Sequence, residues 1–156
     1  MIGQLTFDHL RRALQLPLPG QAAQAMMWPR PFPSAAPPPS GQHGRDAAVL
    51  LLVFPAGGEL CLALTRRTET VQNHKGQISL PGGAREGEET LLETALREAR
   101  EEIAAPTADL DVLGTLTPVY VAVSGYVITP FVAIAARRPH FRPDPAEVVE
   151  AIETPL

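Results

Sequence analysis

The hydrophobic pattern divides the chain into an N-terminal helix, an irregular connector and a region dominated by strands. Apolar residues recur at helical spacing over 6–16, which predicts a short amphipathic helix that ends before Pro17. Prolines and small polar residues fill 29–44, and this composition excludes a helix interior or a sheet ladder. We therefore expect residues 1–44 to form a helix and a connector that pack on one domain over 45–156.

Strand-like and helix-like segments alternate after the connector. Strands are predicted at 47–54, 59–65, 77–80, 112–123 and 126–136, and the first two form a hairpin around a turn of small residues. Helices are predicted at 88–103 and at 144–152, the second opened by Asp144 as its N-cap. Strands and helices mixed around one sheet indicate an α/β fold with an α/β/α sandwich architecture.

Overall charge and the length of the apolar runs exclude two classes of protein. A net charge of −4 and a pI near 5.5 argue against nucleic-acid binding, because affinity for the phosphate backbone depends on clustered Lys and Arg. The longest apolar run, 47–54, is far shorter than the roughly 18 to 20 residues that span a bilayer, and the N-terminus lacks a secretory pattern. We therefore expect no membrane contact and a cytoplasmic location.

Three glutamates of the helix predicted at 88–103 share one helical face. At about 100° per residue, Glu98 and Glu102 lie one turn apart and Glu101 lies beside them. Like charges at this spacing repel each other, so we expect a cation to offset them. Mg²⁺ suits the position because it binds through carboxylates, waters and substrate phosphates. The cluster is also compatible with a solvated helix face whose glutamates are neutralised by Arg97 and Arg100.

The residues before this helix favour a ligand site over a solvated face. Pro81, Gly82 and Gly83 end a strand with a turn in which the backbone can approach a ligand closely. Arg97 lies eight positions after Glu89, and we expect the two side chains to form an ion pair that anchors the loop to the helix.

The segment 83–105 resembles the Nudix box, a pattern of glycine, glutamate, an Arg-Glu pair and a Glu-Glu pair at fixed spacing. These positions are Gly83, Glu89, Arg97, Glu98, Glu101 and Glu102, and Ala104 stands where the family has glycine. The resemblance implies a Nudix-type α/β/α sandwich around a mixed β-sheet and hydrolysis of a diphosphate that joins two organic groups. It also implies that Glu98, Glu101 and Glu102 are metal ligands and catalytic residues for Mg²⁺ or Mn²⁺.

The segment 63–83 is similar to an additional motif of the Nudix group that cleaves coenzyme A. The matching residues are Leu64, Thr65, Arg67, Gly76, Pro81, Gly82 and Gly83, and the departures are Ala63, Thr68, Gln72 and Leu80. The resemblance implies cleavage of coenzyme A to 3′,5′-ADP and 4′-phosphopantetheine. Positive charge beside a metal site suits a ligand with several phosphates. We therefore assign substrate binding to Arg66, Arg67, His74, Lys75, Gly82 and Gly83, although each charge is also compatible with an exposed loop.

Other residues and functions stay open at this stage. A later acidic residue completes the site in many members of the fold, and Glu147 and Glu150 are the candidates. A basic segment around His140, with Arg137, Arg138 and Arg142, suits a phosphate contact or, more simply, a solvated loop. The alternatives are a Nudix pyrophosphatase for ADP-ribose or other nucleotide derivatives and a catalytically silent Nudix-fold binding domain. We expect a small-molecule substrate and a monomer or homodimer.

Overall fold

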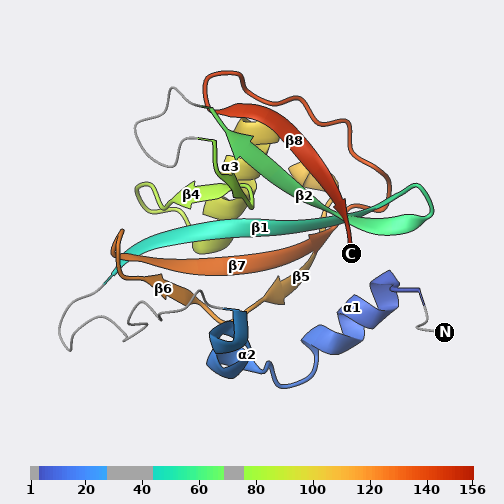
Figure 1. The fold of residues 1–156 in the computed structure, drawn as a ribbon, viewed down its shortest axis with the longest axis horizontal. Coiled ribbons are helices and arrows are strands. Elements are labelled where there is room, and N and C mark those ends of the chain that lie inside the picture. The colour runs from blue at the N-terminus through green and yellow to red at the C-terminus, as the bar shows by residue number, and fades with distance from the viewer. Residues whose placement is uncertain (1–3, 28–43, 69–75) are drawn as a thin grey trace.

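One mixed β-sheet organises the chain in the computed structural model, which describes residues 4–27, 44–68 and 76–156 (Figure 1). The helices are α1 (Phe7–Leu14), α2 (Gly20–Met27) and α3 (Leu91–Ile103), with a 3₁₀ turn at Thr107–Asp109. The strands are β1 (Arg45–Ala56), β2 (Glu59–Arg67), β3 (Ile78–Ser79), β4 (Gly82–Ala84), β5 (Asp111–Thr115), β6 (Val119–Val121), β7 (Tyr126–Ile134) and β8 (Val148–Pro155). The expected α/β architecture around a mixed sheet is confirmed.

Strand β1 is the centre of the sheet and changes neighbours along one of its edges. It pairs in parallel with β7, from Arg45 opposite Tyr126 to Val53 opposite Ile134. On the other edge its first half pairs with β4 and its last residues, from Val53 onward, pair with β2. Between these two partners, the Leu50 amide donates to the Pro81 carbonyl at 2.8 Å. The sheet therefore forks, with β4 on one arm and the β2–β3 hairpin on the other.

The core lies between this sheet and α3. Ala48, Leu50, Leu52 and Phe54 of β1 are fully buried and belong to one cluster with Ala95, Ala99 and Ile103 of α3. Alternate residues of a strand point to opposite faces, so Ala47 and Val49 face away from α3. On this second face Ala47 and Val53 are buried and Val49 and Leu51 are half-buried, so the sequence of β1 is a continuous apolar run instead of an alternating one.

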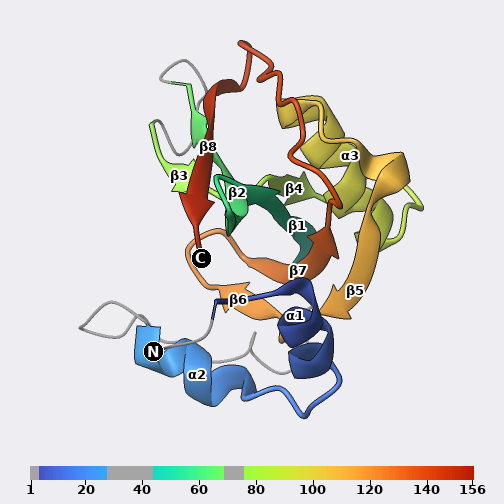
Figure 2. The ribbon, with the colours of Figure 1, turned by 90° about the vertical axis from the view of Figure 1, so that its right-hand side faces the viewer.

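The N-terminal helices lie on the side of the sheet opposite α3, next to β5 and β6 (Figures 1 and 2). Arg11 of α1 pairs with Asp111 at 2.8 Å, and the Gln24 side chain of α2 donates to the Thr117 carbonyl at 2.8 Å. Most of the connector expected at 29–44 lies outside the described residues. None of the described helices is long and apolar enough to cross a membrane.

The helix predicted at 144–152 is wrong, because this segment forms a turn followed by β8. The Asp144 carbonyl accepts from the amides of Glu147 and Val148, which makes a single helical turn. The chain then becomes extended and pairs antiparallel with β2, from Val148 opposite Arg67 to Pro155 opposite Cys61. The β-branched residues of this segment favour a strand, and the edge of β2 supplies a hydrogen-bonding partner that an isolated helix lacks.

Two other predictions need correction. The strand predicted at 112–123 is two strands, β5 and β6, which are separated at 116–118 and pair with different parts of β7. Pro118 explains the break, because proline cannot donate to a sheet ladder. Helix α2 was not predicted, since Gly20–Met27 has little contrast between polar and apolar positions. The helix at 6–16, the hairpin and the helix at 88–103 are confirmed, with shorter bounds for both helices.

Helix α3 begins with a capping box and ends at a residue of unusual conformation. The Thr90 hydroxyl accepts from the Glu93 amide, and the Glu93 carboxylate accepts from the Thr90 amide. Ala104 follows the last turn with φ 54° and ψ 40°, the left-handed conformation that usually belongs to glycine. It is the only non-glycine residue with positive φ in the part of the chain that the structure describes.

Replacing Ala104 with glycine should therefore stabilise the fold. The left-handed conformation costs an alanine roughly 1–2 kcal/mol, and the greater freedom of glycine in the unfolded chain offsets part of the gain. We expect Ala104→Gly to raise the free energy of unfolding by about 0.5–1 kcal/mol in urea denaturation. Ala108→Gly, which lies in the 3₁₀ turn and has no positive φ, is the control and should lower it. A loss of stability in Ala104→Gly would contradict this account.

Candidate active site

The acidic face of α3 packs closely against the turn at Gly82 and Gly83. The Gly82 amide donates to Glu102 Oε2 at 3.1 Å. A Cβ built on Gly83 would lie 2.5 Å from Glu98 Oε1, and one built on Gly82 would lie 2.3 Å from the Ala48 carbonyl oxygen. The fold therefore needs glycine at position 82, where a Cβ would meet the backbone of β1, whereas a Cβ at position 83 would displace the Glu98 carboxylate.

Arg97 holds the loop before α3 and two of the three glutamates. Its guanidinium donates to both oxygens of Glu89, at 2.8 and 3.0 Å, which confirms the predicted ion pair. It also donates to Glu98 at 2.8 Å, to Glu101 at 3.0 Å and to the Ala84 carbonyl at 3.1 Å. The hydrogen bonds from Arg97 are the largest of the causes that lower the pKa of Glu89 to about 2. Arg97 is thus a central fixed charge that orients the acidic face.

Glu102 is a buried carboxylate with little positive charge around it. Its side chain is 2% exposed, and its only ion pair among the described residues is with Arg67 at 3.4 Å. Burial is the largest cause that raises the pKa of Glu102 to about 7, against the lowering effects of the Gly82 amide and Arg67. Burial also raises the pKa of Glu98. The long contact with Arg67 therefore compensates the buried charge only in part.

The donor set fits a divalent cation held by Glu98 and Glu102. As the side chains lie, the described residues contain no converging group of three His, Cys, Asp or Glu, and Glu101 is 56% exposed and turned toward Arg97. Mg²⁺ needs only one or two carboxylates when waters and substrate phosphates complete its shell. A cation at this face would offset the cost of burying two carboxylates. The role of Glu101 as a ligand stays a prediction.

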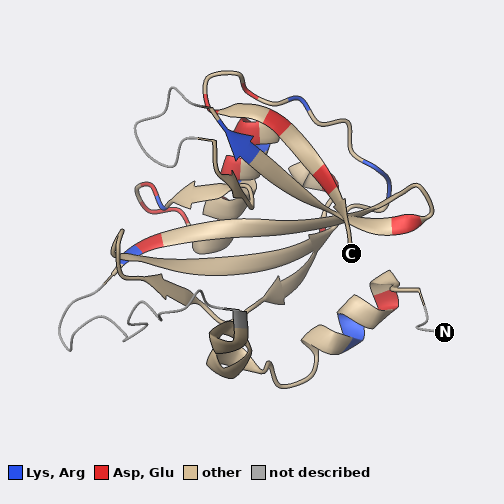
Figure 3. Cartoon of the chain, viewed as in Figure 1, with Lys and Arg blue, Asp and Glu red and all other residues tan. Residues whose placement is uncertain are grey.

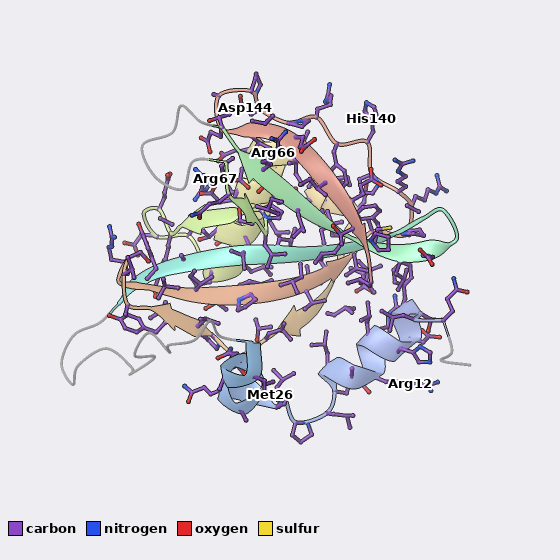
Figure 4. All side chains as sticks on the ribbon, viewed as in Figure 1. Arg12, Met26, Arg66, Arg67, His140 and Asp144 are labelled. Atoms are coloured by element: carbon purple, nitrogen blue, oxygen red, sulfur yellow. The ribbon has the colours of Figure 1, made fainter. Side chains whose placement is uncertain are left out.

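Arg66 and Arg67, both predicted to bind substrate, lie side by side at the end of β2 and take different partners. Figure 3 shows this blue end of β2 beside red segments of α3 and β8. Arg66 pairs with Glu150 of β8 at 2.8 Å, whereas Arg67 contacts Glu102 at 3.4 Å. Figure 4 labels both arginines at this end of β2. The Arg67 Nε–H is buried and has no hydrogen-bond partner among the described residues. His74 and Lys75, with the same predicted role, lie outside the described residues.

A cavity of about 480 Å³ opens beside Arg67 and the glycine turn. Its lining residues come from both arms of the fork and from the neighbouring strands: Ala47, Val49, Arg67, Gln77, Ser79, Leu80, Gly82, Gly83, Ala84, Val121, Ser124, Tyr126 and Ile128. None of them belongs to α3. Arg67, Gly82 and Gly83 therefore connect the acidic face with the cavity. Sequence reasoning missed the apolar lining, because these residues resemble ordinary strand residues.

The two candidates for a later acidic residue differ in position. Glu150 of β8 forms an ion pair with Arg66 of β2. Glu147 lies in the turn before β8, and its charge contributes to the raised pKa of both Glu98 and Glu102. The amide of Thr68 donates to the Glu147 carbonyl at 2.9 Å, which fixes this turn beside the end of β2. Of the two candidates, Glu147 is thus the one whose charge acts on the carboxylates of the acidic face.

The basic segment around His140 lies away from the acidic face. Arg138 makes hydrogen bonds with both oxygens of Glu153, and His140 and Arg138 line a second cavity of about 550 Å³ beside β8. No residue of α3 lines that cavity. Figure 4 shows His140 well apart from Arg67. The arrangement favours a solvated loop over a phosphate contact at the same site.

Comparison with known proteins places these features in one family. The family profile described as NUDIX domain matches residues 44–154. The chain is 42% identical over 113 residues to an uncharacterized Nudix hydrolase, NudL, from Pectobacterium atrosepticum, a match that covers 72% of this chain and 58% of the relative. It is 38% identical over 123 residues to NudL of Photorhabdus laumondii, covering 77% and 65% respectively. The chain thus spans less than two thirds of these relatives.

Solved structures share the fold. A Nudix hydrolase from M. smegmatis, RenU, is 30% identical with a TM-score of 0.61, and the match covers 71% of this chain and 70% of that chain. The NUDIX domain of Shewanella oneidensis NrtR, solved in complex with ADP ribose, has a TM-score of 0.59 at 22% identity, covering 76% and 77%. The second likeness shows the fold alone.

The contact between Gly83 and Glu98 can be tested without any substrate. In Gly83→Ala the new Cβ meets the end of a flexible side chain, so the fold should survive while Glu98 is pushed from its position. We expect Mn²⁺ affinity, measured by EPR titration of the free ion, to fall about tenfold or more with little change in melting temperature.

Gly82→Ala is the matched variant, and it should show the opposite pattern. There the Cβ meets the backbone of β1 and the φ of 155° disfavours a side chain, so the melting temperature should fall by several degrees. Unchanged Mn²⁺ affinity in a folded Gly83→Ala protein would show that Glu98 does not hold the metal.

Proposed function

The chain belongs to the NUDIX domain family, and on this premise we propose that it is a pyrophosphohydrolase that needs Mg²⁺ or Mn²⁺ and cleaves the diphosphate of coenzyme A. The products would be 3′,5′-ADP and 4′-phosphopantetheine. The observation that carries the proposal is the junction at Arg67, Gly82 and Gly83, where the buried carboxylate of Glu102 and the partly buried carboxylate of Glu98 meet the wall of a cavity.

Each part of this junction has a chemical task in diphosphate hydrolysis. A divalent cation held by Glu98 and Glu102 would supply charge to the phosphates and lower the pKa of a bound water. Arg67 lines the cavity, and a phosphate oxygen is a natural acceptor for its guanidinium, whose Nε–H has no partner among the described residues. Arg97 keeps Glu98 oriented through its bonds to Glu89 and Ala84. The backbone of Gly82 and Gly83 lets the substrate approach these groups closely.

The choice of coenzyme A rests on the motif at 63–83 and on where its departures lie. Ala63 is fully buried in the core, and Thr68 is buried with its amide bonded to the Glu147 carbonyl, so both act in packing. Leu80 lines the cavity and is the described departure that a substrate would meet. Gln72 lies outside the described residues. Most of the described departures therefore leave the substrate-facing surface unchanged.

The alternative substrate class is ADP-ribose and related nucleotides, which the NrtR domain illustrates with its bound ADP ribose. A silent binding domain is disfavoured because Glu98, Glu101 and Glu102 are all present. Comparison of the products released from CoA, acyl-CoA, ADP-ribose and NADH separates these possibilities.

Removing the charge of Glu102 should abolish most of the activity and spare the fold. Glu102→Gln keeps the size of the side chain and an oxygen for the Gly82 amide, but it loses one metal ligand. We expect kcat to fall about a thousandfold, or about 4 kcal/mol in barrier height, while the melting temperature stays level or rises. Glu88→Gln, in the turn before α3, is the control. Wild-type turnover in Glu102→Gln, or full activity in excess EDTA, would show that the glutamate cluster of α3 is a solvated helix face and not a metal site.

The substrate itself is tested by comparing CoA with dephospho-CoA. If one of the basic residues assigned to substrate binding contacts the 3′-phosphate, this charge-assisted contact is worth roughly 1.5–3 kcal/mol, so dephospho-CoA should have a kcat/KM about ten- to a hundredfold lower. Arg67→Ala should lower both values similarly, because Arg67 lies beside Glu102 and therefore beside the diphosphate. Equal kcat/KM values for the two substrates would contradict the 3′-phosphate contact. A preference for ADP-ribose over both would favour the alternative, a pyrophosphatase for ADP-ribose and related nucleotides.

A further inference from the structure

The cavity beside Arg67 differs chemically between its two ends. At one end lie Arg67, Gly82 and Gly83, which touch or approach the carboxylates of α3. Val49 of β1 lies beside Gly82 at this same end, and the other end is formed by side chains of β6 and β7, namely Val121, Tyr126 and Ile128. These residues are partly exposed aliphatic and aromatic groups that the core cluster does not include. The cavity is thus polar at the junction and apolar away from it.

The two ends are fixed by strand register. Tyr126 lies opposite both Arg45 of β1 and Val121 of β6, and Ile128 lies opposite Ala47 of β1. Ala47 and Val49 point away from α3, so the apolar end occupies the sheet face opposite the acidic helix. A diphosphate at the acidic face can therefore send only one of its two substituents past Arg67 into this cavity.

Charge decides which substituent suits the cavity. Among the residues that the structure describes, Arg67 is the only charged one that lines the cavity, and its guanidinium already faces Glu102. The nucleotide half of coenzyme A carries a 3′-phosphate on its ribose, so the base cannot enter deeply without bringing that charge toward apolar walls. Burial of an uncompensated charge is strongly unfavourable. The pantetheine half is a neutral chain of aliphatic groups and two amides.

Polar groups at the wall suit such a chain. Ser79, Ser124 and Gln77 are spaced along the cavity among aliphatic residues, and a few polar groups on a mainly apolar wall are typical of small-molecule sites. The volume of about 480 Å³ falls within the usual range of roughly 300–1,000 Å³ for such sites. Hydroxyl and amide side chains can pair with the two amides without requiring a formal charge.

We infer that this cavity binds the neutral pantetheine arm of the substrate, with Val121, Tyr126 and Ile128 as its specificity-determining wall, while the nucleotide half stays outside it. This inference deepens the proposed function and rests on it for the identity of the substrate. It assigns the recognition of the acyl or thiol end to the sheet face opposite α3, separate from the groups that hold the metal.

Methyl NMR on the unmodified chain tests the inference directly. With Ile and Val methyl groups ¹³C-labelled, and the signals assigned by single substitutions, the protein is titrated separately with 4′-phosphopantetheine and with 3′,5′-ADP. We expect 4′-phosphopantetheine to shift the methyl signals of Val121 and Ile128, and 3′,5′-ADP to leave them in place. Shifts caused by 3′,5′-ADP, equal shifts with both halves, or no shift with either would overturn the inference.

A cavity-filling variant gives a second measurement. Val121→Trp places a large ring at the wall, whereas Val123→Trp adds the same ring two residues away at a side chain that is 95% exposed and does not line the cavity. We expect Val121→Trp to raise the Kd for 4′-phosphopantetheine at least tenfold and Val123→Trp to leave it unchanged. Equal affinity in a folded Val121→Trp would count against the inference, and the methyl titration decides the matter if this variant does not fold.

The inference and the proposed function can fail separately. If wild-type protein cleaves CoA but the cavity methyls respond to 3′,5′-ADP, the function stands and the inference falls. If CoA is not cleaved while 4′-phosphopantetheine still shifts those methyls, the cavity assignment stands and the proposed substrate of the reaction is wrong.

Discussion

The close approach between α3 and the Gly82–Gly83 turn is the constraint on which the rest of the structure depends. This turn must pair with β1 as β4 and at the same time lie against the carboxylates of Glu98 and Glu102. A side chain at either glycine would meet the Ala48 carbonyl or the Glu98 carboxylate. The contact between this turn and α3 therefore fixes the position of the helix on the sheet. With the acidic face of α3 on the turn, its apolar face packs on the core.

The same contact concentrates charge that the protein offsets only partly. Arg97 is placed among Glu89, Glu98 and Glu101, so those carboxylates have a strong partner. Glu102 has a single amide and a long contact with Arg67, and its burial outweighs both. A fold selected for stability alone would favour an apolar side chain at this buried position. A buried carboxylate that lowers stability in this way is typical of sites where a bound ligand supplies the missing interaction.

Local signals predicted the parts of this structure in which sequence neighbours interact. Helix α3, its Glu89–Arg97 pair and the β1–β2 hairpin depend on short-range period, spacing and turn residues, and the structure confirms them. The segment at 144–152 was predicted wrongly because one helical turn at Asp144 resembles a helix start, whereas pairing with distant β2 determines the outcome. The cavity was not predicted because Val49, Val121 and Ile128 come together only when β1, β6 and β7 are aligned.

The fork in the sheet also separates two kinds of evolutionary change. Within the described residues, no hydrogen bond or ion pair joins the cavity wall on β6 and β7 to the carboxylates of α3, and only Arg67 and the two glycines both line the cavity and approach those carboxylates. Substitutions of residues that share no partners usually have independent effects. If the cavity binds substrate as we infer, an exchange of Val121 or Ile128 changes the substrate range while the acidic face of α3 stays intact. The architecture thus allows the residues of the cavity wall to change independently of the acidic residues of α3.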